Sequence, residues 1–204
     1  MLTAYSGANT FNQYRQAYPG LDRPDAAAIR TRNLRRYLEL FAGARTILVG
    51  EAAGYGGCRF SGIPFTCEAQ LAGPAPIAWT LDQGLLPSSA REAPWDERSA
   101  RIVWETLRER RDCLLWNAFP WHPYGASGPL SNRPPGRDVR DGWEVLSCLL
   151  ASFPRAQPVA VGRVAHRALS DLGVRAPYIR HPSHGGQREF EAGLAALSNT
   201  ATGG

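Results

Sequence analysis

The stretch RTILVGEAAGYGGCRFSGIPF, residues 45–65, starts with a short apolar run, and its last sixteen positions hold five glycines. A short apolar run bounded by turn residues is typical of a buried β-strand. A glycine-rich segment directly after a strand is often a phosphate-binding loop. Two questions follow: which fold this strand belongs to, and what the glycines are for.

Three more apolar runs match the one at 45–50, namely CLLWNAF (113–119), QPVAVG (157–162) and APYIR (176–180). Helical patterns separate the runs, at 24–43, 96–111, 138–151, 163–172 and 187–197. This alternation predicts an α/β fold, a three-layer α/β/α sandwich with a central four-stranded parallel sheet. We expect residues 1–204 to form a single domain. Ligands in such folds bind at the carboxyl ends of the strands, and we interpret 66–95 and 120–137 as loops over that face.

The glycine segment fits neither of the common nucleotide-binding loops. A P-loop needs a lysine, and all 23 basic side chains of this chain are arginines. A dinucleotide-binding loop opens a helix, whereas Gly54, Gly56 and Gly57 run on toward Pro64. Glycines also allow a flat, rigid ligand to approach the backbone closely, and Phe65 after Pro64 presents an aromatic ring. The segment therefore favours a nucleobase pocket.

Composition limits the possible partners and cofactors. The net charge of +5 suits an anionic partner, although many proteins with such a charge bind nothing acidic. Neither the spacing of the cysteines nor their distance from histidines indicates a metal site, and we expect no metal and no cofactor; the cysteines are Cys58, Cys67, Cys113 and Cys148. The chain has no apolar stretch long enough for a membrane span and no secretion signal, so we expect a cytoplasmic protein without a membrane partner.

Three motifs together resemble the uracil-DNA glycosylase superfamily. They are GEAAGYGGCRFSGIPF (50–65), LLWN at the end of the second strand and HPS after the fourth, in that family's order, and the resemblance covers about residues 45–195. NRPPGRDV (132–139) and GEAAG are similar to the family's thermophile-type branch. That branch usually carries an iron-sulfur cluster, but the cysteines here do not match its pattern. The resemblance therefore implies a relative without a cluster.

The resemblance also implies roles for residues in the base pocket. His181 matches the histidine that donates a hydrogen bond to uracil O2, Asn117 the asparagine that reads N3–H and O4, and Phe65 the ring that stacks on the flipped base. Tyr55 lies near the family's thymine-excluding tyrosine, about one residue out of register. Each residue also has a structural alternative: a histidine before a proline turn, an asparagine after a strand, a core phenylalanine and a loop tyrosine.

The catalytic water and the DNA contacts are where the chain departs from the family. Ala52 stands where the better-known branch has an aspartate that positions water, although its backbone amide remains able to bond the base, and Glu51 is the nearest carboxylate that would act as a catalytic substitute. A surface glutamate is the alternative for Glu51. Ser183 would bind a phosphate. The family's wedge, the side chain that fills the gap left by the flipped base, corresponds to about Gly185 here. One of three neighbouring residues would then act as the wedge, namely His184, Gln187 or Arg188. The alternative is that these residues form the start of a solvated helix.

The resemblance implies a monofunctional DNA glycosylase, acting as a monomer on DNA that contains uracil. Because the chain has no lysine, strand cleavage through a lysine Schiff base is excluded. Three alternatives stay open: a glycosylase for hypoxanthine or mismatched thymine, a non-turnover protein that binds uracil or abasic DNA, and an α/β hydrolase or nucleotide-binding protein. The third lacks both a nucleophile elbow and a P-loop.

Overall fold

The computed structural model describes residues 1–72, 77, 80, 83–108 and 110–201, and within them the centre is a parallel sheet of four strands. The strands are β2 (Thr46–Ala52), β3 (Cys113–Phe119), β5 (Gln157–Val161) and β6 (Tyr178–Ile179). Their order is β3-β2-β5-β6, and each neighbouring pair is parallel. The predicted four-stranded parallel sheet is confirmed. In the sheet, β2 lies between β3 and β5, both of which follow it in sequence. The strand order therefore changes direction at β2, and α/β sheets bind ligands at such a switch point.

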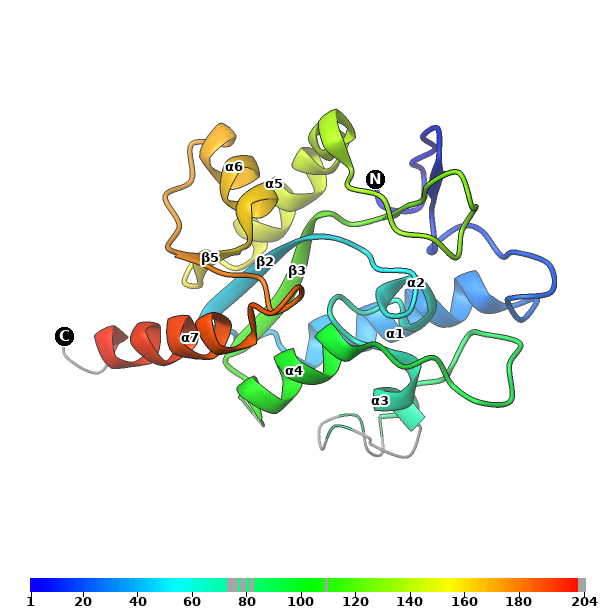
Figure 1. Ribbon diagram of the computed structural model, residues 1–204, viewed down its shortest axis with the longest axis horizontal. Helices are drawn as coiled ribbons and strands as arrows, with labels where there is room; N and C mark the ends of the chain where they lie inside the picture. The colour runs from blue at the N-terminus through cyan, green and yellow to red at the C-terminus, as the bar shows by residue number, and fades with distance from the viewer. Residues whose placement is uncertain (73–76, 78–79, 81–82, 109, 202–204) are drawn as a thin grey trace.

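Helices cover both faces of the sheet (Figure 1). α1 (Ala26–Leu40) and α4 (Arg98–Leu107) lie on one side, and α5 (Trp143–Ser152) and α6 (Arg163–Asp171) on the other. α7 (Gln187–Ala201) packs against the edge strand β6. The predicted three-layer sandwich is therefore confirmed. Among the residues described, no helix is long and apolar enough to cross a membrane.

The core is built around β3, which is buried along its whole length. Its apolar side chains pack against α1 on one face, where the aromatic rings of Tyr37 and Phe41 are fully buried. The Tyr37 hydroxyl accepts a hydrogen bond of 2.6 Å from the backbone N–H of Leu115. A buried hydroxyl without such a partner would cost about 1–3 kcal/mol. The contact therefore fixes α1 against the strand that carries Asn117.

The predicted helices at 24–43 and 187–197 are observed at Ala26–Leu40 and Gln187–Ala201, and two other ranges differ for identifiable reasons. α4 spans Arg98–Leu107 and not 96–111, because Glu97 is extended (φ −134°) and Arg108 has a left-handed φ of 52°. The pattern at 138–151 divides into a 3-10 helix, η2 (Gly136–Gly142), followed by α5. The change falls at Gly142, where the backbone comes so close to β3 that a Cβ would overlap the carbonyl oxygen of Ala118.

The segments interpreted as loops contain short elements that the sequence did not indicate. α2 (Cys58–Ser61) lies inside the glycine-rich stretch, and α3 (Glu68–Ala72) begins the segment 66–95, of which residues 73–76, 78–79 and 81–82 lie outside the described chain. β1 (Thr10–Phe11) pairs antiparallel with β4 (His122–Pro123). Elements this short have no readable periodicity, since they span at most about one turn or one strand repeat.

A buried ion-pair cluster ties the N-terminal segment to α2. Asp22 Oδ1 lies 2.6 Å from Arg30 Nη2 and 2.7 Å from Arg59 Nη1, and all three side chains are fully buried. The Arg59 guanidinium also lies over the rings of Phe11 and Phe60, at 4.3 and 4.0 Å from their centroids. Removing one partner of a buried pair typically costs about 3–5 kcal/mol, because a charge remains buried alone. The cluster therefore holds α2 in place within the glycine-rich stretch.

Two further N-terminal side chains bond the backbone around the carboxyl end of the sheet. The Gln13 amide Nε2 donates a hydrogen bond of 2.7 Å to the carbonyl oxygen of Pro120, just after β3. The Tyr14 hydroxyl donates one of 3.0 Å to the carbonyl oxygen of Gly62, just after α2. Residues 10–22 therefore hold in place the backbone around the carboxyl end of the sheet, where ligands are expected to bind.

Candidate active site

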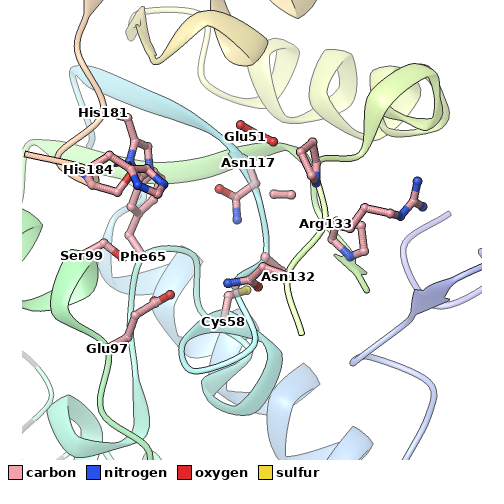
Figure 2. Close-up of a pocket in the computed structure, with 16 residues that line it drawn as sticks. Glu51, Cys58, Phe65, Glu97, Ser99, Asn117, Asn132, Arg133, His181 and His184 are labelled. Atoms are coloured by element: carbon pink, nitrogen blue, oxygen red, sulfur yellow. Dashed lines mark hydrogen bonds between the residues drawn. The ribbon is translucent and has the colours of Figure 1, made fainter. Parts of the chain in front are cut away.

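A cavity of about 360 Å³ opens at the carboxyl end of the sheet (Figure 2). This volume lies within the range of small-molecule sites, about 300–1,000 Å³. Of the residues that the sequence proposed for the site, it is lined by Glu51, Ala52, Phe65, Asn117, His181, Ser183 and His184. These residues come from three strand ends that are far apart in sequence. The fold therefore brings together the motifs that carried the family resemblance.

Asn117 places an unpartnered carboxamide in this cavity. The side chain is 2% exposed, and within the described chain no hydrogen bond engages its oxygen or its nitrogen. Its amide atoms are not among the fully buried polar atoms that lack a partner, so they are accessible from the cavity. Asn117 sits in β3 directly opposite Gly50 of β2. A donor and an acceptor that open into a cavity and have no partner in the described chain are available to a bound ligand.

Phe65 forms an aromatic wall of the cavity beside Gly50. Its backbone has a left-handed φ of 53°, a conformation that non-glycine residues seldom adopt and that concentrates at functional sites. A Cβ on Gly50 would overlap the Phe65 ring and would lie 2.9 Å from Asn117 Oδ1. The first glycine of the stretch therefore makes room for two side chains of the site.

His181 lines the cavity with an imidazole whose tautomer is defined by its contacts. The backbone N–H of Ser183 donates to His181 Nδ1 (3.2 Å), and the Ser183 hydroxyl lies 2.8 Å from the same atom. Because Nδ1 accepts from an N–H, the ring hydrogen resides on Nε2. Burial, with a smaller contribution from His184, lowers the pKa of His181 to about 4. The imidazole is therefore neutral near pH 7, with Nε2–H available as a donor.

Ser183 has a contact that the sequence did not indicate. The sequence predicts that its hydroxyl binds a DNA phosphate, and in the structure the hydroxyl contacts His181 Nδ1. The predicted phosphate contact stays a prediction. The two uses are compatible, because a hydroxyl has one donor and two acceptor positions.

The end of β2 supplies one carboxylate and one alanine. Ala52 lines the cavity with a methyl group, as expected from the sequence, and so places no carboxylate there. Glu51 also lines the cavity, and burial raises the pKa of its carboxyl. The catalytic role predicted for Glu51 stays a prediction.

Tyr55 and Gln187 line a second cavity, of about 510 Å³, that adjoins the first. The Tyr55 ring stands edge-on to Trp95, 5.9 Å between centroids, so its predicted place beside thymine's methyl group stays a prediction. Gln187 Nε2 donates to Glu191 Oε1 at 2.9 Å. Arg188 is exposed in the first turn of α7. The tip of the HPS loop carries left-handed φ values at His184 (52°) and Gly185 (77°).

Several residues of the first cavity were not proposed from sequence. They are Cys58, Glu97, Ser99, Asn132 and Arg133. Asn132 Oδ1 accepts a hydrogen bond of 3.0 Å from the backbone N–H of Tyr55, and Arg133 Nη2 pairs with Asp138 Oδ2 at 3.0 Å. The segment NRPPGRDV contained a signal for Asn132 and Arg133, because it contributed to the family resemblance. No local pattern marks Glu97.

The position of the Glu97 side chain accounts for two more glycines of the stretch 45–65, Gly54 and Gly57. A Cβ on Gly54 would lie 2.5 Å from Glu97 Oε1, and a Cβ on Gly57 would overlap Oε2. The carboxyl group therefore packs directly on the glycine backbone. Burial raises the pKa of Glu97 from its usual 4.5 to about 7, and the nearby Ser99 opposes that change in part.

The raised pKa predicts that Glu97→Gln stabilises the protein in alkaline solution. The unfolded chain loses this proton near pH 4.5 and the folded chain near 7, so stability falls as pH rises between these values. At pH 8 we expect the variant to gain about 2 kcal/mol in free energy of unfolding, or roughly 4–8 °C in Tm, and at pH 4.5 little. Thermal unfolding at both pH values measures this difference. An equal loss of Tm at both would contradict it.

Within the described chain, no group of three or more histidine, cysteine or acidic side chains is arranged to hold a metal ion. The cysteines are free thiols, with Cys58, Cys67 and Cys113 buried and Cys148 exposed. Burial raises the pKa of the Cys58 thiol, which lines the cavity, to about 12. The thiol is therefore protonated near neutral pH.

Comparison with known proteins supports the fold. Neither a protein-family model nor a curated protein sequence matches the chain. Among solved structures, it is similar to wild-type Pedobacter heparinus SMUG2, with a TM-score of 0.59 and 13% sequence identity, over 97% of this chain and 95% of that one. Over nearly its whole length the chain thus has the fold of SMUG2, a member of the uracil-DNA glycosylase superfamily, as its motifs implied.

Proposed function

We propose that this protein is a monofunctional DNA glycosylase that removes uracil from DNA by hydrolysis of the N-glycosidic bond. The observation that carries the proposal is the unpartnered carboxamide of Asn117, which faces the same cavity as the Nε2–H of His181 and the ring of Phe65. The fold of the uracil-DNA glycosylase superfamily supports glycosylase chemistry in general.

The carboxamide favours uracil over cytosine. Uracil presents an N3–H donor and an O4 acceptor, which Asn117 Oδ1 and Nδ2 complement. Cytosine presents the reverse pattern at that edge and would leave buried polar groups unpaired, at about 1–3 kcal/mol each. The Phe65 ring would stack on the flipped base.

His181 would stabilise the departing base. Breaking the glycosidic bond places negative charge on uracil and positive charge on the sugar, and donors aimed at the growing charge lower the barrier. A neutral imidazole with its hydrogen on Nε2 donates to uracil O2 without a prior change of protonation state. The Ser183 amide holds the ring in this tautomer.

Arginines beside the cavity suit the DNA backbone. A groove of about 400 Å³ between the end of β5 and the HPS loop is lined by the exposed Arg163 and Arg180, next to His181 and His184. Phosphate oxygens are the natural partners of such side chains. Because the chain has no lysine, the abasic product would be left uncleaved.

A base-release assay tests the proposal. Single- and double-stranded oligonucleotides with uracil, thymine or hypoxanthine at one position are incubated with the protein, and abasic sites are revealed by hot alkali. We expect release of uracil, and strand breaks only after alkali. Intact uracil oligonucleotides would overturn the proposal, and breaks without alkali would overturn its monofunctional part. A protein–DNA adduct that survives denaturing electrophoresis would indicate the non-turnover alternative.

A further inference from the structure

Glu97 stands at the boundary between the two adjoining cavities. It lines both of them, as do Ser99, Asn132, Ser183 and His184. Asn117 and Phe65 line only the first of the two, whereas Tyr55 and Gln187 line only the second. Glu97 is the residue just before α4, and in Figure 2 its side chain lies below those of Phe65 and Ser99.

The position of the Glu97 carboxyl group is set on several sides. The backbone of Gly54 and Gly57 packs directly against the two carboxyl oxygens of Glu97. Ser99, in the first turn of α4, lies beside the carboxyl and lines the same two cavities. A carboxylate held by such contacts is oriented before any substrate arrives.

The boundary is the expected position of the sugar if the proposed function holds, on which this inference rests. The base would occupy the first cavity, where Asn117 and Phe65 are, and the DNA strand would pass along the HPS loop and Gln187 of the second. The glycosidic bond joins base to strand and so must cross from one cavity to the other. A group that lines both is therefore close to C1′ of the flipped nucleotide.

We propose that Glu97 is the carboxylate that orients and deprotonates the attacking water, the function for which Ala52 has no side chain. As the C1′–N1 bond breaks, its electron pair leaves with uracil. The water oxygen forms a bond to C1′, and one water proton passes to Glu97. The abasic sugar and the uracil anion result, and the anion is protonated from solvent as Glu97 releases its proton.

Glu51, the other carboxylate that lines the first cavity, lies toward the groove at the end of β5 and not toward the second cavity. It lines the first cavity and the groove at the end of β5, on the side of Arg163, and is not among the residues of the second cavity. The lining residues therefore place Glu97, and not Glu51, between base and strand.

The ionisation of Glu97 provides a signature of this role. With its pKa raised to about 7 by burial, the carboxylate form that accepts a proton becomes populated as pH rises through neutrality. Other titratable or charged groups near it or lining the two cavities are Asp96, Arg98, Tyr55, Cys58, Cys67, Glu51, Arg133, His181 and His184. The pKa of His181 is lowered to about 4, and the thiol pKa values of Cys58 and Cys67 are raised to about 12 and 11. These three groups therefore titrate outside the range from pH 6 to 8.

The test compares Glu97→Gln with Glu51→Gln in single-turnover release of uracil from pH 5.5 to 8.5. We expect Glu97→Gln to slow release more than tenfold at pH 8 and to remove the rise in rate that the wild type shows through about pH 7. Glu105→Gln, at an exposed position of α4, is the control and should match the wild type. Affinity for an oligonucleotide that carries 2′-fluoro-2′-deoxyuridine, which resists hydrolysis, should change less than about threefold in Glu97→Gln, because its amide keeps the shape of the side chain.

Each outcome is decisive. A wild type that releases uracil while Glu97→Gln keeps both its rate and its pH profile overturns the role of Glu97 alone. If Glu51→Gln releases uracil slowly while Glu97→Gln releases it at the wild-type rate, Glu51 and not Glu97 is the carboxylate that activates water. Loss of analogue binding in proportion to rate would make Glu97 a binding residue and overturn the water-activating role. A wild type that releases no base from any oligonucleotide overturns the proposed function and this inference together.

Discussion

A His181→Ala variant should release uracil about 100- to 1,000-fold more slowly than the wild type, which is the usual effect of removing one donor to a developing oxyanion. Nε2–H is the donor lost, because Nδ1 already accepts the Ser183 amide. The pKa of His181 is lowered to about 4, so the ring is neutral from pH 5.5 upward. The ratio of wild-type to variant rates should therefore stay constant between pH 5.5 and 8.

Single-turnover rates at several pH values check this result, and taking the ratio cancels any pH dependence that arises elsewhere in the site. His166→Ala is the matched control, since His166 is exposed on α6 and outside the cavity. A ratio that grows toward pH 5.5 would show that the imidazolium is the active form. A variant as fast as the wild type would remove His181 from the mechanism.

Gly50→Ala should reduce uracil release about 100-fold although it adds only a methyl group. The new Cβ overlaps the Phe65 ring and comes within 2.9 Å of Asn117 Oδ1, so the stacking ring, the carboxamide or both must move. Displacing catalytic or binding groups by about 1 Å is enough for a loss of this size. Overpacking should also lower the free energy of unfolding by about 1–3 kcal/mol.

Gly43→Ala is the control for Gly50→Ala, because a Cβ on Gly43 meets nothing within 4 Å. Rates and thermal unfolding of both variants are compared with those of Phe65→Ala and of the Gly50→Ala, Phe65→Ala double variant. If the ring is what the methyl group displaces, the two substitutions will be strongly non-additive. Additive effects, or a Gly50→Ala variant with wild-type activity, would show that this contact does not shape the pocket.

The strands were predictable because each one lies in a short apolar run, and β3 is buried along its whole length. The motif residues at their ends were predictable for a related reason: parallel strands bring their carboxyl ends to one edge of the sheet, so Asn117 and His181 had to be near the glycine stretch. The short elements α2 and α3 were not predictable, because their few residues are placed by contacts with distant segments.

Glu97 shows why part of the site escaped prediction. Its proximity to Gly54 and Gly57 is a tertiary contact across forty residues, and no local spacing in sequence announces it. The same limit applies to the tautomer of His181, which depends on the direction of a single backbone N–H. The glycines were visible in the sequence, but not the side chains that they accommodate, namely Phe65, Asn117 and Glu97.

The buried cluster of Asp22, Arg30 and Arg59 implies a constraint on how the chain can change through descent. The carboxylate and the two guanidinium groups lie in three segments that are separate in sequence, and all three side chains are fully buried. A replacement of Asp22 is tolerable only with matching replacements of the arginines. Among relatives, the amino-terminal segment should therefore vary in step with the short helix α2 inside the glycine-rich stretch, and the three positions should be inherited as one unit.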